Sequence, residues 1–266
     1  MSSPASPSLA AFTALSAPPD ARPNALVLCD HAGRAIPADY GDLGLPSSVF
    51  ERHIAYDIGA AGVSRVLAAE LGAPALLANF SRLLIDANRG PDDPTLVMRL
   101  SDGAIVPGNA RVDEAEVARR KAEWWEPYQS AIAAQIDGLI AQGTPPALVS
   151  IHSFTPAWKG VPRPWHVGVL WDRDGRLAQP LLDALAREGD LVVGDNEPYD
   201  GALIGDTMYR HGTQRGLAHA LIEVRQDLVA DEAGQIAWGK RLARLLRPIL
   251  ALPDLHEIRH FGSRAG

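Results

Sequence analysis

Three polar residues that can bind a metal or move a proton end apolar runs typical of buried strands. They are His31, His152 and Glu223. In an open α/β sheet, ligands bind beyond the carboxyl ends of the strands, so side chains at such positions can meet at one site. Histidine and carboxylate ligands hold catalytic zinc, which keeps a fourth position open for water. The pattern therefore predicts an enzyme that uses a metal to activate water.

We predict that His31 and His152 are metal ligands and that Asp57 is the third. Asp57 stands just ahead of a helical pattern that begins near Ile58, where a carboxylate can reach a metal or cap the first turn of the helix. Both interpretations of Asp57 stay open, and each histidine could instead be an ordinary hydrogen-bonded side chain. The two histidines lie far apart in the sequence and match no compact metal-binding motif.

Glu223 ends an apolar run, where a buried carboxylate needs a partner or a function. We predict that it is the general base, which takes a proton from water and returns it to the leaving amine. Such a base typically raises the rate 10²- to 10⁴-fold. A structural ion pair with Arg225 is the alternative, although Arg225 is also a predicted substrate-binding residue.

A second polar cluster follows an apolar segment in Ser81–Arg89. We predict that Asn88 and Arg89 bind a substrate carboxylate, the arginine through two parallel hydrogen bonds, and that Arg82 stabilises the oxyanion of the reaction. The alternative is a set of surface salt bridges with Asp86, Asp92 or Asp93.

The composition narrows the class of protein. With 266 residues and 47% hydrophobic content, the chain can form one large α/β domain, expected over residues 24–266 after a disordered or loosely packed tail at 1–23. A net charge of −7 argues against nucleic acid as a partner. No apolar run is long enough to span a membrane. The single cysteine, Cys29, fits a cytoplasmic protein, expected as a monomer or small homo-oligomer.

Strand and helix patterns alternate along the chain, which is typical of a parallel or mixed sheet with helices on both faces. The helical spacing predicts helices over 58–71, 112–142, 177–187 and 235–250, the second of them bent at Pro127. Apolar runs predict strands over 25–29, 75–80, 83–85, 147–151, 166–171, 191–193 and 218–224. The long segment 90–109, rich in Pro, Asp and Gly, is expected to be a functional loop over the site.

Four motifs in this order resemble those of the N-formylglutamate amidohydrolase family, whose members are distant relatives of the zinc carboxypeptidases. The motifs are D-H-A-G at His31, S-R-L-L-I-D-A-N-R ending at Arg89, S-I-H-S-F at His152 and H-A-L-I-E-V-R-Q-D-L at Glu223. The resemblance runs from Leu26 to Leu228. It implies a three-layer α/β/α fold with a mixed central sheet, similar to that of zinc exopeptidases, and one zinc per chain. The implied reaction converts N-formyl-L-glutamate to formate and L-glutamate, a step of histidine degradation.

The resemblance also implies particular functions for these residues, with one departure. His31 and His152 would hold zinc, Glu223 would be the base, and Asn88 with Arg89 would match the carboxylate-binding pair of the carboxypeptidase relatives. Those relatives place a glutamate ligand three residues after the first metal histidine, but Arg34 stands there in this chain. Asp57 replaces it in our prediction, because the family has an acidic residue before its first long helix.

Two other classes of function stay open at this point. A non-catalytic anion-binding protein could keep the fold and the carboxylate-binding pair, and a peptidase or cell-wall amidase could use the same metal site on a longer substrate. A serine hydrolase acting through Ser153 is disfavoured, because the chain has no G-x-S-x-G turn. The sequence leaves open which acyl group is removed and whether Tyr199 or His211 contacts the substrate.

Overall fold

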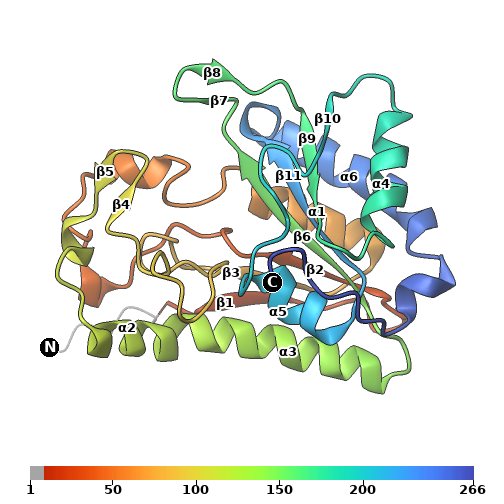
Figure 1. Ribbon diagram of the computed structural model, residues 1–266, viewed down its shortest axis with the longest axis horizontal. Coiled ribbons are helices and arrows are strands. Elements are labelled where there is room, and N and C mark those ends of the chain that lie inside the picture. Colours follow the sequence, from red (N-terminus) through yellow and green to blue (C-terminus); the bar gives the residue numbers. More distant parts are fainter. Residues whose placement is uncertain (1–8) are drawn as a thin grey trace, which may run out of the picture.

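A seven-stranded mixed sheet forms the centre of the computed structural model, which describes residues 9–266 (Figure 1). Its strands in spatial order are β1 (Phe12–Leu15), β3 (Ala75–Ala78), β2 (Ala25–Cys29), β6 (Ala147–Phe154), β11 (His219–Arg225), β9 (Val167–Leu170) and β10 (Val193–Asp195). The four strands β3, β2, β6 and β11 run parallel to one another, whereas β1 and β9 are antiparallel to their inner neighbours. The mixed sheet is therefore confirmed.

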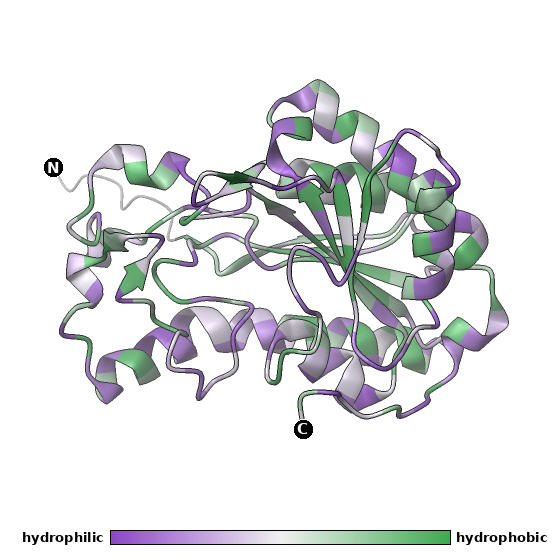
Figure 2. Cartoon of the chain, turned by 45° about the horizontal axis from the view of Figure 1, so that its top comes forward, coloured by the Kyte–Doolittle hydropathy of each residue, from purple (hydrophilic) through white to green (hydrophobic). Residues whose placement is uncertain are grey.

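Helices cover both faces of this sheet. One face carries α1 (Ala60–Leu71), α4 (Ala178–Ala186) and α6 (Glu232–Ile249), and the other carries α2 (Glu114–Arg120), α3 (Glu126–Ala141) and α5 (Thr207–His211). Side chains alternate along a strand, so Val27 packs in the core under α1 and α6 while Leu26 packs in the core under α3. Figure 2 shows the hydrophobic strands between the helical layers. The predicted three-layer α/β/α fold is confirmed.

The long helical pattern over 112–142 forms α2 and α3, joined by a π-helical turn at Lys121–Trp125. Pro127 follows this turn directly. Proline has no backbone N–H to donate within the helix, so the hydrogen-bond pattern changes near it. The turn also buries Trp125, whose indole N–H donates to the Arg89 carbonyl at 3.0 Å. The irregularity thus supports the segment that carries Arg89.

The prediction of a disordered or loosely packed tail is wrong for Phe12–Leu15, which form β1. These residues pair antiparallel with β3, and the Thr13 hydroxyl donates to the Asn79 side chain at 2.9 Å. Phe12 packs against the core beside α3. A four-residue strand inside a Ser- and Pro-rich segment has too few residues to show a clear period, and contacts with distant parts of the chain stabilise it. Residues 1–8 of the predicted tail lie outside the described residues.

The predicted strand at 83–85 is also wrong, although all three residues are fully buried. The segment is irregular, and side chains rather than a neighbouring strand satisfy its backbone carbonyls. Asn109 donates to the Leu83 carbonyl at 2.8 Å, and Arg120 donates to the Leu84 carbonyl at 2.8 Å. Buried polar backbone must be hydrogen-bonded, but a strand is only one way to achieve it.

Two small hairpins and several short helices complete the fold. The hairpins are β4 (Leu100–Ser101) with β5 (Ala104–Ile105), and β7 (Ala157–Trp158) with β8 (Val161–Pro162). The short 3₁₀ helices lie at Ala38–Tyr40, Ser47–Glu51, Pro107–Asn109, Thr213–Arg215, Gln226–Leu228 and Pro253–His256. None of the helices within residues 9–266 has both the length and the hydropathy needed to cross a membrane.

Candidate metal centre and catalytic pocket

The carboxyl ends of β2, β6 and β11 bring the predicted site residues to one edge of the sheet. His31 follows β2, and in the pairing of β6 with β11 His152 lies opposite Glu223. Both strands continue two residues beyond these positions, so His152 and Glu223 lie inside strands rather than at their last residues. The turn after His31 needs Gly33, because a Cβ there would lie 2.0 Å from the Asn79 carbonyl oxygen.

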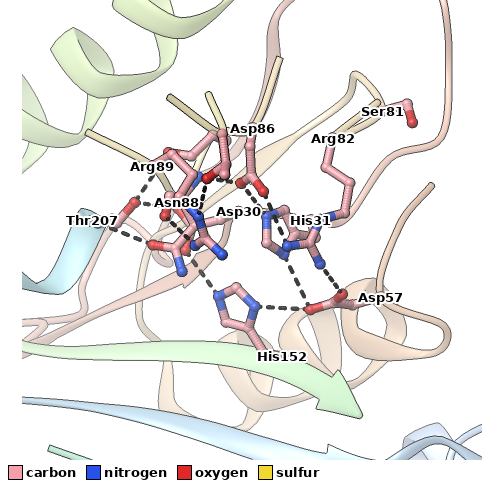
Figure 3. Close-up of polar contacts among 12 residues, drawn as sticks. Asp30, His31, Asp57, Ser81, Arg82, Asp86, Asn88, Arg89, His152 and Thr207 are labelled. Carbon is pink, nitrogen blue, oxygen red and sulfur yellow. Dashed lines mark hydrogen bonds and ion pairs between the residues drawn. The ribbon is translucent and has the colours of Figure 1, made fainter. Parts of the chain in front are cut away.

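His31, Asp57 and His152 form a buried group that can hold a metal ion (Figure 3). One donor atom from each lies within 4.8 Å of the others. The Asp57 Oδ2 atom is 3.4 Å from His31 Nδ1 and 2.8 Å from His152 Nδ1. Two donors about 2.1 Å from a tetrahedral zinc are about 3.4 Å apart, so the group needs little change to bind one. The predicted ligands therefore meet, and their donor set fits a divalent cation such as zinc.

The structure rejects the capping alternative for Asp57. The residue before α1 is Gly59, and no side chain caps this helix. The Asp57 Oδ2 atom instead lies 2.8 Å from His152 Nδ1 and accepts a hydrogen bond from the Ser153 backbone amide at 3.3 Å. Burial raises the pKa of Asp57, but His31 and His152 lower it by more, so it lies below its usual value. Asp57 is therefore an ionised carboxylate facing both imidazoles.

Glu223 lies in the same pocket and has a free carboxylate oxygen. The residue is 6% exposed, and its Oε2 atom is buried without a hydrogen-bond partner among the described residues. Burial raises the pKa of Glu223 to about 7, and Asp57 acts in the same direction against His152, His31 and Arg82. A base with a pKa near the working pH suits proton transfer in both directions. The alternative pairing is wrong, because Arg225 pairs with Asp227.

Arg82 joins this group through two buried carboxylates. Its guanidinium lies 3.0 Å from Asp86 and 3.4 Å from Asp57. The salt bridge between Arg82 and Asp86, one of the alternatives considered from the sequence, therefore exists. Asp86 is fully buried, however, and not on the surface. Arg82 also lines the pocket, so its pairing does not remove it from the substrate's reach.

Asn88 and Arg89 line the pocket as a neighbouring pair. The backbone amide of Thr207 donates to the Asn88 side-chain oxygen at 3.0 Å, which turns the Asn88 amide nitrogen away from that helix end. Arg89 bonds to Thr95 and to the Asn88 carbonyl, and forms no ion pair with any carboxylate of residues 9–266. Within these residues, the alternative surface salt bridge of Arg89 with Asp92 or Asp93 is absent. Arg89 thus keeps its charge available for an anion.

Together these side chains line a cavity of about 390 Å³. Its polar side carries the three candidate metal ligands with Arg82, Asn88, Arg89 and Glu223. Its apolar side is formed by Phe154, Leu170, Leu203 and Leu221. This size lies in the range of small-molecule sites.

Residues 24–230 match the N-formylglutamate amidohydrolase family. The chain belongs to the N-formylglutamate amidohydrolase family. It is 30% identical to the N-formylglutamate deformylase of Pseudomonas aeruginosa over 208 residues, which are 69% of this chain and 74% of that protein. Membership in the N-formylglutamate amidohydrolase family confirms the predicted family and the prediction of a hydrolase that acts on a linear amide.

Two solved structures have folds similar to that of this family member. A gene product of Agrobacterium tumefaciens is 35% identical with a TM-score of 0.85, and the match covers 91% of this chain and 95% of the other. The N-formylglutamate amidohydrolase of Ralstonia eutropha JMP134 is 24% identical with a TM-score of 0.66, over 91% of this chain and 98% of that protein. The second of these likenesses concerns the fold alone.

Two predictions about the site are wrong, because the residues concerned do not line the pocket. Arg225, a predicted substrate-binding residue, does not line the pocket, because Asp227 and the backbone carbonyls of 163–165 hold its guanidinium. Segment 90–109 is not a cover over the site, since none of its residues lines the pocket. Its Leu96 and Val97 instead pack in the core beside α3.

Several residues beside the candidate ligands of this family member were not predicted from the sequence. Asp30 and Asp86 contact the far sides of the two imidazoles, and Thr207 contacts Asp30 (Figure 3). Asp86 directly follows the apolar run at 83–85 within the motif that ends at Arg89, and this place in the sequence was the available signal. Of the two residues left open, Tyr199 lines the pocket, whereas His211 is held outside it by Gln129 at 2.7 Å. Arg34 pairs with Glu51 and does not line this pocket.

Proposed function

We propose that this protein is a zinc-dependent amidohydrolase that cleaves N-formyl-L-glutamate to formate and L-glutamate. The observation that carries the proposal is the free, buried carboxylate oxygen of Glu223 in the same pocket as the His31, Asp57 and His152 group. A binding protein has no need of an unpaired buried acid there, since such a group is costly. The deformylase relative and the family name support the choice of N-formylglutamate.

Glu223 is the proton carrier in this proposal. When bound, zinc supplies a Lewis acid that makes water nucleophilic near neutral pH. Glu223 takes the proton of the attacking water and later gives it to the amine nitrogen that leaves with glutamate, so one residue acts first as base and then as acid. A pKa raised to about 7 by burial suits both steps.

The arginine side of the pocket orients the substrate. Arg89 and the Asn88 amide bind a glutamate carboxylate, because both line the cavity and Arg89 has no carboxylate partner in residues 9–266. Arg82 faces the charge that develops on the formyl oxygen, a contribution of roughly 2.7 to 4 kcal/mol for a well-placed donor. Arg82 keeps its own orientation through Asp57 and Asp86.

The size of the cavity favours a small substrate over a peptide or a cell-wall fragment. A volume of about 390 Å³ is near the lower end of small-molecule pockets. We place the reaction in the cytoplasm, whose reducing conditions suit a chain with the single buried cysteine Cys29.

The test is release of formate and glutamate from N-formyl-L-glutamate by zinc-loaded protein. We expect hydrolysis that stops after chelation and returns with zinc, and a 10²- to 10⁴-fold lower kcat for Glu223→Gln. Glu188→Gln is the matched control, because Glu188 pairs with Arg244 and does not line this cavity. Equal rates for wild type and Glu223→Gln would remove Glu223 from the reaction. Absence of hydrolysis despite bound zinc would favour another N-acyl substrate or the binding protein.

A further inference from the structure

Each imidazole of the candidate metal group is held at its far nitrogen by its own buried aspartate (Figure 3). We propose that Asp30 and Asp86 are positioning residues that fix the tautomer of His152 and His31, so that Nδ1 of each faces the metal, and that Thr207 holds Asp30 in place. The inference rests on the proposed function only in needing a bound metal, whatever the substrate.

Asp30 is surrounded by hydrogen-bond donors. Its Oδ2 atom lies 3.0 Å from His152 Nε2 and accepts from the Ser150 hydroxyl at 3.1 Å. Its Oδ1 atom accepts from the Thr207 hydroxyl at 2.7 Å. The residue is only 1% exposed, so solvent does not compete for these contacts. Both oxygens of the carboxylate are therefore committed to fixed neighbours.

Asp86 holds His31 in the same way from the other side. Its Oδ1 atom lies 2.6 Å from His31 Nε2 and accepts from the Asn88 backbone amide at 2.9 Å. Its Oδ2 atom accepts from Arg82 at 3.0 Å. Asp86 is fully buried, and it links the imidazole to the residues that line the substrate side of the pocket.

These contacts decide which imidazole nitrogen is a donor. An ionised carboxylate only accepts hydrogen bonds, so the Nε2 atom that faces Asp30 or Asp86 is a donor. A metal ion bound by Asp57 and both imidazoles would take the Nδ1 lone pairs, so each ligand histidine would be neutral with its proton on Nε2. In both histidines Nδ1 is the atom that faces Asp57, at 3.4 Å for His31 and 2.8 Å for His152. A carboxylate behind a metal-binding histidine orients the ring and raises its basicity.

Thr207 connects this arrangement to the substrate side. It is the first residue of α5 and is 1% exposed. Its hydroxyl donates to Asp30 while its backbone amide donates to the Asn88 side chain. One residue therefore holds both the orienting partner of His152 and a member of the predicted carboxylate-binding pair. Loss of the hydroxyl should weaken the metal site and leave the backbone contact to Asn88 in place.

The test measures zinc affinity of the whole protein by competition with a chelator. For Asp30→Asn we expect a dissociation constant about 10- to 100-fold higher, because an amide cannot accept from all three donors. Thr207→Val should lose about threefold to tenfold, and Thr207→Ser, which keeps the hydroxyl, should restore affinity to within twofold of wild type. The matched control is Asp174→Asn, a buried aspartate that pairs with Arg176 and shares no hydrogen-bond partner with the site.

A loss of affinity in Asp30→Asn no larger than in Asp174→Asn would overturn the proposal. If Asp30→Asn fails to fold, a second measurement on the wild type tests the proposal. Nitrogen-15 NMR of the histidine-labelled, zinc-loaded protein should show that Nε2 is protonated and Nδ1 is bound to the metal in both His31 and His152. Zinc on Nε2 of either histidine, or no zinc binding at all, would also overturn it. Failure to hydrolyse N-formylglutamate with these results intact would reject the substrate and keep the positioning assignment.

Discussion

The two sides of the pocket differ in how completely their polar atoms are paired. On the metal side, both nitrogens of His31 and of His152 face buried carboxylates. On the substrate side, Arg89 forms no ion pair within the described chain and Glu223 has a free buried oxygen. One side is fixed before any ligand arrives, and the other keeps its hydrogen-bonding capacity for one.

This contrast has a physical reason. A metal ion needs donors whose lone pairs already point to one place, because reorienting several side chains costs conformational entropy at the moment of binding. A substrate brings its own polar groups, so the protein must leave complementary groups unpaired and accept the cost of burying them. Changes on the metal side should therefore remove the ion, whereas changes on the substrate side should leave the ion bound.

The largest effect should come from His152→Ala. Removing one of three protein donors should reduce bound zinc to below a tenth of an equivalent after dialysis, and hydrolysis by more than about 10³-fold, since the metal contributes several kcal/mol to the reaction. Zinc content by mass spectrometry and formate release are the measurements. His211→Gln is the matched control, because His211 is equally buried but lies outside the pocket. Full zinc content in His152→Ala would contradict the assignment of His152 as a metal ligand, and with it the difference between the two sides of the pocket.

On the substrate side, Arg89→Met should keep zinc but lose about 10²- to 10³-fold in kcat/KM for N-formylglutamate, because an anionic group would lose its charged partner. Most of the loss should be in KM if Arg89 binds substrate and transition state equally. Arg89→Lys is the comparison, with an intermediate loss, since lysine keeps the charge but not the paired donors. Unchanged KM in Arg89→Met would exclude Arg89 from substrate binding.

Sequence patterns predicted the metal side better than its surroundings. His31 and His152 could be found because each ends or interrupts a run of strand residues, and parallel strands bring their carboxyl ends to one edge. Asp30 could not be found in this way. Its partner His152 belongs to another strand, a relation that only the folded sheet creates.

Two of the wrong predictions, for Arg225 and for the segment 83–85, also arise from contacts between residues that are distant in the chain. Arg225 was predicted to bind substrate because it follows Glu223, yet carbonyls of residues 163–165 hold it elsewhere. The apolar run at 83–85 is buried as expected, but Asn109 and Arg120 make its backbone contacts in place of a strand. Hydrophobic runs indicate burial, whereas hydrogen-bond partners distant in the chain decide the backbone form and the direction of a charged side chain.

A third prediction compares two buried histidines with opposite pKa shifts. Burial lowers the pKa of both, but Asp30 and Asp57 raise that of His152 well above its usual value. His211 faces the neutral Gln129 side chain at 2.7 Å, and its pKa falls to about 4, mainly through burial and then through Arg210. The partner carboxylates, rather than burial, therefore decide the direction in which the pKa of a buried histidine of this protein moves.

The low pKa of His211 makes stability depend on pH. The unfolded chain, with a histidine pKa near 6.5, binds a proton more readily than the folded protein, so the contribution is complete above pH 6.5 and is lost as the pH falls from 6.5 to 4. The loss is about 3 kcal/mol. Urea unfolding at several pH values should show a shallower decline over this window for His211→Gln than for wild type. Parallel curves would show that His211 titrates normally in the folded protein.

The smallest effect should come from Asp102→Ala, in the hairpin formed by β4 and β5. Asp102 lies 3.2 Å from Arg52 and 3.5 Å from His53, and His53 lines the pocket. These contacts are partly exposed, and such pairs contribute about 0 to 1 kcal/mol. If segment 90–109 only packs beside the site, the substitution should change kcat/KM by less than about threefold and unfolding by at most about 1 kcal/mol. A loss comparable to that of Arg89→Met would mean that this hairpin acts on the substrate after all.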